Sequence, residues 1–310
     1  MSTLLLSHPA CLNHLTPAGH PERPDRLRAI EQVLEDEKFQ SLARVEAPLG
    51  PVDIIALCHP MDYIEAIREA SPTEGLVRLD ADTAMSPGSF EAALRAVGGA
   101  KLAVDEVMAG KASNAFVATR PPGHHTETAR PMGFCLFNNA AIAARYAQQS
   151  HGVERAAIVD FDVHHGNGSQ EIFWADKTVM YCSTHQMPLF PGTGALSETG
   201  VGNIFNAPLK PGDDGDDFRE AMLSRVLPAL HDFAPDFLLV SAGFDAHVKD
   251  PLAQLRLVEA DFAWITEKLL EAATKHTGGK LVSTLEGGYD LDALASSTAV
   301  HVKTLMGAAS

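Results

Sequence analysis

The stretch Ile158-Val-Asp-Phe-Asp-Val-His-His-Gly-Asn-Gly-Ser-Gln170 decides both the expected fold and the expected site. It begins as part of an apolar run that is typical of a buried strand. Polar residues then alternate at Asp160, Asp162 and His164 before the chain turns at a glycine. In extended backbone, residues two apart project to the same side, roughly 7 Å from one another. Asp162 and His164 can therefore reach one metal ion from neighbouring positions.

Two interpretations of this pair are open on the residues alone. Asp and His side chains that follow a strand often cap the next turn and bind no metal. A Zn²⁺ ion held by one neutral His and by carboxylates, with a coordination position left for water, is typical of a catalytic site. The rest of the chain has to decide between them.

Strands and helices alternate along most of the chain, which predicts a parallel, doubly wound sheet with helices on both faces. We expect a single-domain, three-layer α/β/α protein with a mostly parallel central sheet over residues 1–310. The Gly- and Pro-rich segment 186–215 is expected to be loop. The expected strands are 114–119, 156–161, 179–183, 237–241 and 281–285. The first main helix is expected to start at 23–25, and the others are 62–70, 87–108, 137–149, 216–233, 259–274 and 290–306.

Composition excludes several classes of function. The 310 residues carry a net charge of −16, whereas broad nucleic-acid binding needs a basic face. No stretch approaches the roughly 20 apolar residues of a membrane span. The four cysteines are widely spaced without a C-x-x-C pair, which favours a reducing compartment. We expect a cytoplasmic protein without nucleic-acid or membrane partners, and the oligomeric state stays open.

Four of the expected strands end in polar clusters. The clusters are Arg120-Pro-Pro-Gly-His-His125, Asp162-Val-His164, Ala242-Gly-Phe-Asp245 and Glu286-Gly-Gly-Tyr-Asp290. Ligands of open α/β sheets bind outside the carboxyl ends of the strands, so the four clusters are expected to converge. The sequence has no G-x-S-x-G elbow, H-E-x-x-H helix or P-loop that would indicate another chemistry.

Taken together, these motifs resemble the histone deacetylase family of the arginase/deacetylase superfamily. The likeness is to its class II branch and to bacterial histone deacetylase-like amidohydrolases, and it extends from Gly19 to Tyr289. The motifs G-F-C-x-F-N-N (133–139) and F-P-G-T-G (190–194) also match, in the order of the family. The resemblance implies the arginase/deacetylase fold and a metal-dependent hydrolase that acts on linear amide C–N bonds.

The resemblance implies a Zn²⁺ ion bound by Asp162, His164 and Asp245. Two carboxylates and one imidazole nearly neutralise the ion and leave open coordination positions. Fe²⁺ is compatible with the same ligands. The resemblance also implies a monovalent cation, usually K⁺, beside the divalent ion, at the positions Asp160, Asp162, His164, Ser183 and Thr184.

The catalytic groups are implied in the same way. His125 is the general base that takes a proton from the attacking water and later protonates the leaving amine. His124, oriented by Asp160, assists it electrostatically. Tyr289 donates its hydroxyl to the developing oxyanion. Asn167 stands where class I members carry an acid, so His125 should be less basic here than in class I.

The substrate is expected to enter a narrow tunnel. Phe134, with Gly133 before it, and Phe190 match the tunnel walls of the family, and Leu252 matches a gatekeeper at the mouth. Asp82 matches a rim position that binds the substrate backbone. Such a slot suits the four methylenes of an acyl-lysine side chain, whose burial favours binding by about 0.8 kcal/mol each.

Besides Asn167, one further position departs from a pattern in the superfamily, and it concerns the number of metal ions. Two-manganese ureohydrolases need another acid two residues after the Asp245 position, where this chain has His247. A single divalent ion is therefore expected.

We interpret the sequence as a zinc-dependent deacylase of N-ε-acetyl- or acyl-lysine in peptides or proteins. The first alternative is an acetylpolyamine amidohydrolase, which acts on small acylated amines with the same active site. The second alternative is an inactive scaffold that binds acyl-lysine. An inactive relative usually loses a metal ligand or the tyrosine, and this chain keeps all of them.

Overall fold

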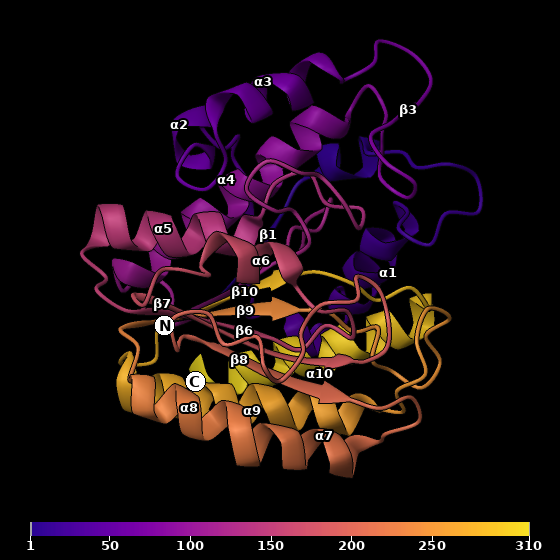
Figure 1. Ribbon diagram of the computed structural model, residues 1–310. Coiled ribbons are helices and arrows are strands. Elements are labelled where there is room, and N and C mark those ends of the chain that lie inside the picture. The colour runs from indigo at the N-terminus through magenta and orange to yellow at the C-terminus, as the bar shows by residue number, and fades with distance from the viewer. Residues whose placement is uncertain (1, 310) are drawn as a thin grey trace.

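A parallel sheet forms the middle layer of the molecule (Figure 1). The structure is a computed structural model that describes residues 2–309. Within these residues the main sheet has eight strands in the order β2-β1-β5-β10-β9-β6-β7-β8, and every neighbouring pair is parallel. The strands are β1 (Thr3–Ser7), β2 (Ala43–Glu46), β5 (Asn114–Val117), β6 (Ala156–Asp160), β7 (Val179–Gln186), β8 (Ile204–Leu209), β9 (Phe237–Ala242) and β10 (Leu281–Leu285). A separate antiparallel pair is formed by β3 (Val77–Arg78) and β4 (Ala84–Met85).

Helices cover both faces of the sheet, as Figure 1 shows. One face carries α2 (Val52–Ile55), α3 (Met61–Glu69), α4 (Ser89–Met108), α5 (Asn139–His151) and α6 (Asn167–Ile172). The other carries α1 (Asp25–Leu34), α7 (Gly215–Ala221), α8 (Leu227–Phe233), α9 (Glu259–His276) and α10 (Leu291–Ala309). The expected single-domain, three-layer α/β/α architecture is confirmed.

The central strands are apolar on both faces because each face meets a helical layer. On β6, Ala157 and Val159 join the core under α1, α9 and α10, whereas Ile158 joins the core under α4 and α5. Leu238 and Leu239 of β9 divide in the same way. This is why the segment after residue 155 appears in the sequence as a continuous apolar run.

The four strands that end in polar clusters are neighbours. Their order in the sheet is β5-β10-β9-β6, so their carboxyl ends form one continuous edge at the centre of the molecule. The expected convergence of the clusters is confirmed.

The expectation of loop throughout residues 186–215 is wrong, because β8 lies inside this segment at one edge of the sheet. Its sequence, Ile-Phe-Asn-Ala-Pro-Leu, contains a proline, which only an edge strand accommodates easily. The opposite edge strand, β2, was also not expected, since three of its four residues are exposed and give no apolar run. The predicted helix 216–233 is interrupted by a π-helical segment, Met222–Val226, just before Pro228.

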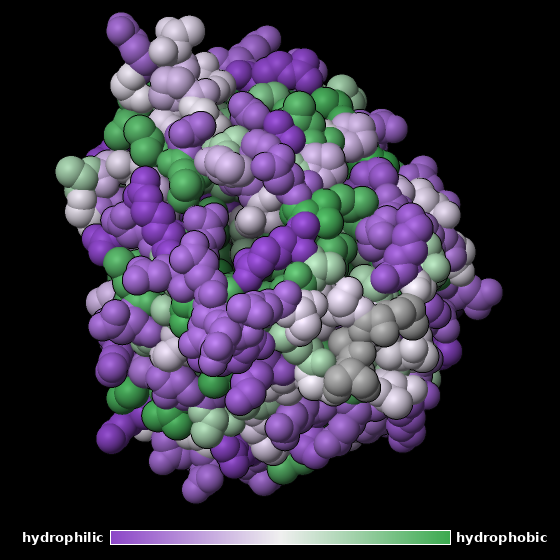
Figure 2. Space-filling model, turned by 180° about the vertical axis from the view of Figure 1, so that it is seen from behind, coloured by the Kyte–Doolittle hydropathy of each residue, from purple (hydrophilic) through white to green (hydrophobic). Residues whose placement is uncertain are grey.

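The surface opposite to that of Figure 1 is mostly hydrophilic, with separate apolar patches (Figure 2). Among the described helices, none has the length and apolar character that crossing a membrane requires. All four cysteines are buried free thiols.

We predict that Gly98→Ala destabilises the protein although alanine favours helix. Gly98 lies in the middle of α4, where an added Cβ would overlap the backbone carbonyl of Pro48 and come within 2.6 Å of the Gly50 nitrogen. Overpacking against backbone should cost about 1–3 kcal/mol of unfolding free energy, more than the helix propensity gained. The control is Gly307→Ala in α10, where an added Cβ meets no atom within 4 Å. Equal denaturant midpoints for the two variants would contradict the prediction.

Candidate metal centre

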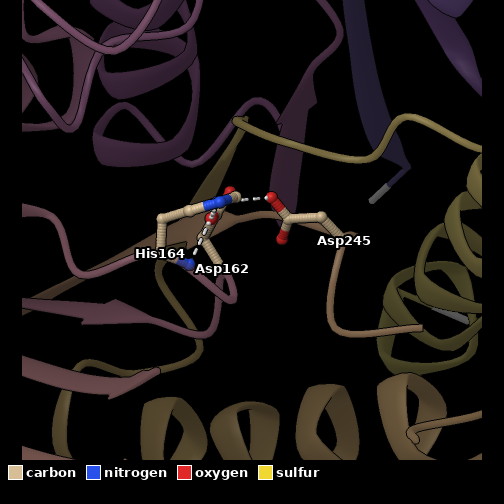
Figure 3. A group of neighbouring side chains, drawn as sticks. All are labelled: Asp162, His164 and Asp245. Carbon is tan, nitrogen blue, oxygen red and sulfur yellow. Dashed lines mark hydrogen bonds and ion pairs between the residues drawn. The ribbon is translucent and has the colours of Figure 1, made fainter. Parts of the chain in front are cut away.

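Two carboxylates and an imidazole meet at the sheet edge (Figure 3). Asp162 and His164 follow β6, and Asp245 follows β9, the strand beside it. His164 Nδ1 lies 3.2 Å from Asp162 Oδ1 and 3.0 Å from Asp245 Oδ2. One ligand atom from each residue lies within 4.8 Å of the others, so the three side chains can bind a single ion.

Backbone N–H groups fix the two carboxylates. The Val163 N–H donates to Asp245 Oδ1 at 2.8 Å, and the Gly287 N–H donates to Asp162 Oδ2 at 2.7 Å. A Cβ at Gly243 or at Gly287 would overlap these carboxylates, so glycine is needed where the backbone approaches them. The ligands are thus held by the strands and their neighbouring turns rather than by mobile side chains.

The charges of this group fit a divalent cation. Both carboxylates are fully buried, and burial together with the charge of Asp162 raises the pKa of Asp245 to about 7. Burial alone would lower the pKa of His164, but its bonds to the two carboxylates raise it to about 10. The paired carboxylates therefore need positive charge at this point, and a divalent ion with O and N ligands supplies it.

His247 does not join the group. Its ring is stacked 6.5 Å from Phe262, and its Nε2 lies 3.6 Å from Glu259. Within residues 2–309 no other group of His, Cys, Asp or Glu has metal-ligand spacing. The geometry thus agrees with one divalent ion rather than two.

The adjacent histidines His124 and His125 have different partners. His124 Nδ1 lies 2.9 Å from Asp160 Oδ2, and His125 Nδ1 lies 2.9 Å from Asn167 Oδ1. Asn167 donates its own NH₂ to Glu127 at 2.9 Å, so its oxygen must accept from His125. In neutral His125, Nε2 is then the free acceptor.

The same partners give the two rings different charge states, with their centroids only 4.0 Å apart. Burial would lower the pKa of His124, but the charges of Asp160 and Asp162 raise it to about 10. Burial and the charges of His124 and His164 hold the pKa of His125 well below its ordinary value. His125 is therefore the neutral member of the pair.

A buried carboxylate holds the backbone of the segment that carries His124 and His125. Glu286, at the end of β10, accepts the N–H of Gly123 at 2.8 Å and that of His124 at 3.2 Å. It also accepts the hydroxyl of Ser241 at 3.0 Å. Glu286 has no expected role from the sequence, although its place in the motif after β10 is the available signal.

A buried cluster of ion pairs, drawn from separate parts of the sequence, supports the backbone around Tyr289. Glu22 is fully buried and paired with Arg26 and Arg120. Arg26 donates to the carbonyls of Glu286 at 2.5 Å and Gly288 at 2.6 Å, and its guanidinium lies 4.9 Å from the Tyr289 ring centroid. The sequence analysis did not identify this cluster, because its members lie in three separate segments.

The candidate substrate residues line one cavity of about 230 Å³. His125 and the metal ligand His164 both line it, and Leu189 is a lining residue that was not expected. Asp250 connects two of the others, since it accepts the N–H groups of both Leu252 and Tyr289. The full lining is Asp82, His125, Gly133, Phe134, His164, Leu189, Phe190, Leu252 and Tyr289.

The residues expected to bind a monovalent cation include the metal ligands Asp162 and His164 and lie on β6 and β7 or directly after β6. Asp160 and Ser183 are paired in register on β6 and β7. The Thr184 hydroxyl is buried without a hydrogen-bond partner in the described part of the chain. Oxygen atoms in this arrangement fit a hard cation.

Comparisons with known proteins agree with this geometry. The family described as Histone deacetylase domain matches residues 20–305. The histone deacetylase-like amidohydrolase of Pseudomonas aeruginosa is 40% identical, over 88% of this chain and 73% of that protein. A probable deacetylase of Methanothermobacter thermautotrophicus is 42% identical, over 93% and 86% of the two chains. A crystal structure of the HDA15 HD domain superposes with a TM-score of 0.93 at 35% identity, over 99% of this chain and 88% of that one.

We predict that the metal-free protein takes up close to one equivalent of Zn²⁺. Asp162→Ala and Asp245→Ala should each lose most of this uptake, because each removes one of three ligands and leaves a buried group unpaired. Asp82→Ala, at the cavity mouth, is the control that should keep it. Elemental analysis after loading and desalting measures the content, and two equivalents of manganese would contradict a mononuclear site.

Proposed function

The chain belongs to the histone deacetylase family and is a hydrolase of amide bonds, and from this premise we propose that it is a Zn²⁺-dependent deacetylase of N-ε-acetyl-lysine. The observation that carries the proposal is the cavity of about 230 Å³ that His125, His164 and Tyr289 line together. Its aromatic walls, Phe134 and Phe190, suit an unbranched aliphatic stem. Its inner end brings together a base, a hydroxyl donor and the metal-ligand group.

A bound Zn²⁺ would polarise the substrate carbonyl and make water a stronger nucleophile, with Asp162, His164 and Asp245 as ligands. Fe²⁺ could serve in the same ligand set. A K⁺ ion could bind at Asp160, Asp162, His164, Ser183 and Thr184. It would offset part of the negative charge of the Asp160 and Asp162 carboxylates. The unpaired Thr184 hydroxyl and the buried Asp160 support this second ion.

The proton transfers fall to His125. Its Nε2 is the free acceptor of the neutral ring, because Nδ1–H donates to Asn167. We infer that His125 takes the proton of the attacking water and returns it to the departing lysine amine. The neighbouring His124, held cationic by Asp160, keeps His125 neutral at rest and stabilises negative charge that develops beside it.

Tyr289 is suited to donate to the substrate oxygen. It lines the cavity in edge-to-face contact with Phe134, with ring centroids 5.8 Å apart. Burial raises the pKa of its phenol well above the ordinary value, so the hydroxyl keeps its proton. Its hydrogen bond to the carbonyl oxygen would strengthen as that oxygen becomes negative.

Leu252 favours a peptide substrate over an acetylated polyamine. It is half-buried at the cavity, and its backbone is held by Asp250. A leucine offers no partner to the second ammonium group of a polyamine, whereas an acyl-lysine peptide presents neutral amides beyond its stem. Leaving that cation without a partner costs about 1–3 kcal/mol where the rim is partly buried.

We predict that Tyr289→Phe lowers kcat by roughly 10²–10³-fold, because it removes one oxyanion donor and no metal ligand. The metal content should stay at the wild-type level. Steady-state kinetics on an acetyl-lysine peptide and elemental analysis of the same preparation measure the two quantities. An unchanged kcat would exclude the donor role, and a loss of metal would make the role structural.

We predict that kcat/KM is higher for acetyl-lysine peptides than for N-acetylated polyamines, and that Leu252→Glu narrows or reverses this ratio. The new carboxylate would pair with the distal ammonium of the polyamine. Leu252→Gln is the matched control for size without charge, and Asp82→Ala in both backgrounds shows whether that acid contributes. A wild-type preference for the polyamine would overturn the lysine assignment.

A further inference from the structure

The tunnel wall at Phe190 belongs to a segment with little regular structure, residues 187–203 between β7 and β8, here called the Phe190 loop. The Phe190 side chain is 41% exposed, and its ring lies 5.1 Å from that of His125 and 6.4 Å from that of His164. Apolar packing of the Phe190 side chain is therefore incomplete, although the neighbouring Leu189 packs against the core. Polar contacts of the loop add to what holds Phe190 beside the reacting groups.

Glu198 makes the central contacts. Its Oε2 accepts the N–H of Gly194 at 2.9 Å, and its Oε1 accepts the N–H of Ala195 at 3.1 Å. Its Oε2 also accepts the side-chain amide of Gln170 at 2.6 Å. Gln170 belongs to α6, so one carboxylate connects the Phe190 loop to the helix that follows the metal ligand His164.

The carboxylate also sets the direction of the next hydrogen bonds. Because it only accepts, Gln170 presents its NH₂ to Glu198 and its oxygen to His165 Nε2, 3.1 Å away. His165 therefore carries its proton on Nε2. Its Nδ1 accepts the hydroxyl of Thr193 at 2.7 Å. The loop is thus bound, three residues after Phe190, to the residue next to a metal ligand.

His185 provides a second attachment from β7. Its Nε2 lies 2.9 Å from the Gly194 carbonyl, which can only accept, so Nδ1 accepts the Ser183 hydroxyl at 2.8 Å. Gly194 has φ +96°, and a Cβ there would overlap the His185 ring. The loop backbone is therefore in direct contact with this ring, and only glycine fits.

We propose that Glu198 is a positioning residue that sets the width of the acyl-lysine tunnel through Phe190. The inference rests on the proposed lysine deacetylase function. It goes beyond that function by naming a residue that determines which acylated lysine side chains the tunnel accepts. Without the carboxylate, the amides of Gly194 and Ala195 and the Gln170 side chain lose their shared acceptor. The Phe190 loop can then move outward, which weakens the contact with the lysine stem and admits wider acyl groups.

The kinetic test compares Glu198→Gln, Glu198→Ala, Phe190→Ala and the double variant Glu198→Ala/Phe190→Ala. Glu198→Ala should raise KM for an acetyl-lysine peptide roughly tenfold and change kcat by less than about threefold, the pattern of lost uniform binding. The isosteric Glu198→Gln, which keeps one acceptor, should lie between Glu198→Ala and wild type. The relative rate with butyryl-lysine should rise in both. Glu220→Ala, an exposed acid on α7, is the control for charge and should match wild type.

The double variant decides whether Glu198 acts through Phe190. If it does, Glu198→Ala in the Phe190→Ala background should raise KM for the acetyl-lysine peptide by less than about twofold. The effects of two substitutions in one contact network are not additive. Full additivity of the two losses would overturn the proposal, as would an unchanged KM and acyl preference in both Glu198 variants.

Hydrogen exchange gives a readout that is independent of activity. Amides 187–203 should exchange faster in Glu198→Gln than in wild type, with β6, β9 and metal content unchanged. Unchanged protection of the loop would overturn the inference. If the wild type hydrolyses acetylpolyamines and not acetyl-lysine peptides, the proposed function fails. The role of Glu198 is then still decided by hydrogen exchange and by the double-variant kinetics measured with the acetylpolyamine.

Discussion

Four carboxylates, those of Asp160, Asp162, Asp245 and Glu286, are fully buried at the ends of three neighbouring strands. Burying a charge costs several kcal/mol unless other groups compensate it. Much of the polar structure around the sheet edge provides this compensation. Backbone N–H groups of the adjoining turns and the histidine rings each satisfy part of it, and the proposed cations would satisfy more.

This constraint explains why the site residues are held so firmly. Asp162 receives the N–H groups of His164 and Gly287, and Glu286 receives those of Gly123 and His124. Each carboxylate that needs donors thereby fixes the backbone of a residue that carries chemistry. Donors and acceptors that are in place before the reaction do not have to reorganise during it, which is the main source of electrostatic catalysis.

The walls of the substrate tunnel are held in place by different interactions from those that hold the metal ligands. The metal ligand in the tunnel lining follows a strand, whereas Phe134, Phe190 and Leu252 come from segments between the helices and strands. Such walls depend on charged side chains that reach several backbone groups at once, as Glu198 does for the Phe190 loop and Asp250 does for Leu252 and Tyr289. Variation in these loops can alter the substrate while the chemistry at the sheet edge stays the same.

The sequence by itself determined the layered fold, the central strands and the convergence of the four polar clusters. These have local signals, since a strand buried on both faces is continuously apolar and parallel strands bring their ends to one edge. The edge strand β8 gave no such signal, because one side of it needs no partner and tolerates Pro208. Only the tertiary structure placed Glu22 with Arg120 and showed the hydrogen bond between Glu198 and Gln170. Contacts of this kind join segments far apart in the chain, and a charged residue in a loop has the same local pattern whether it is buried in a network or exposed to water.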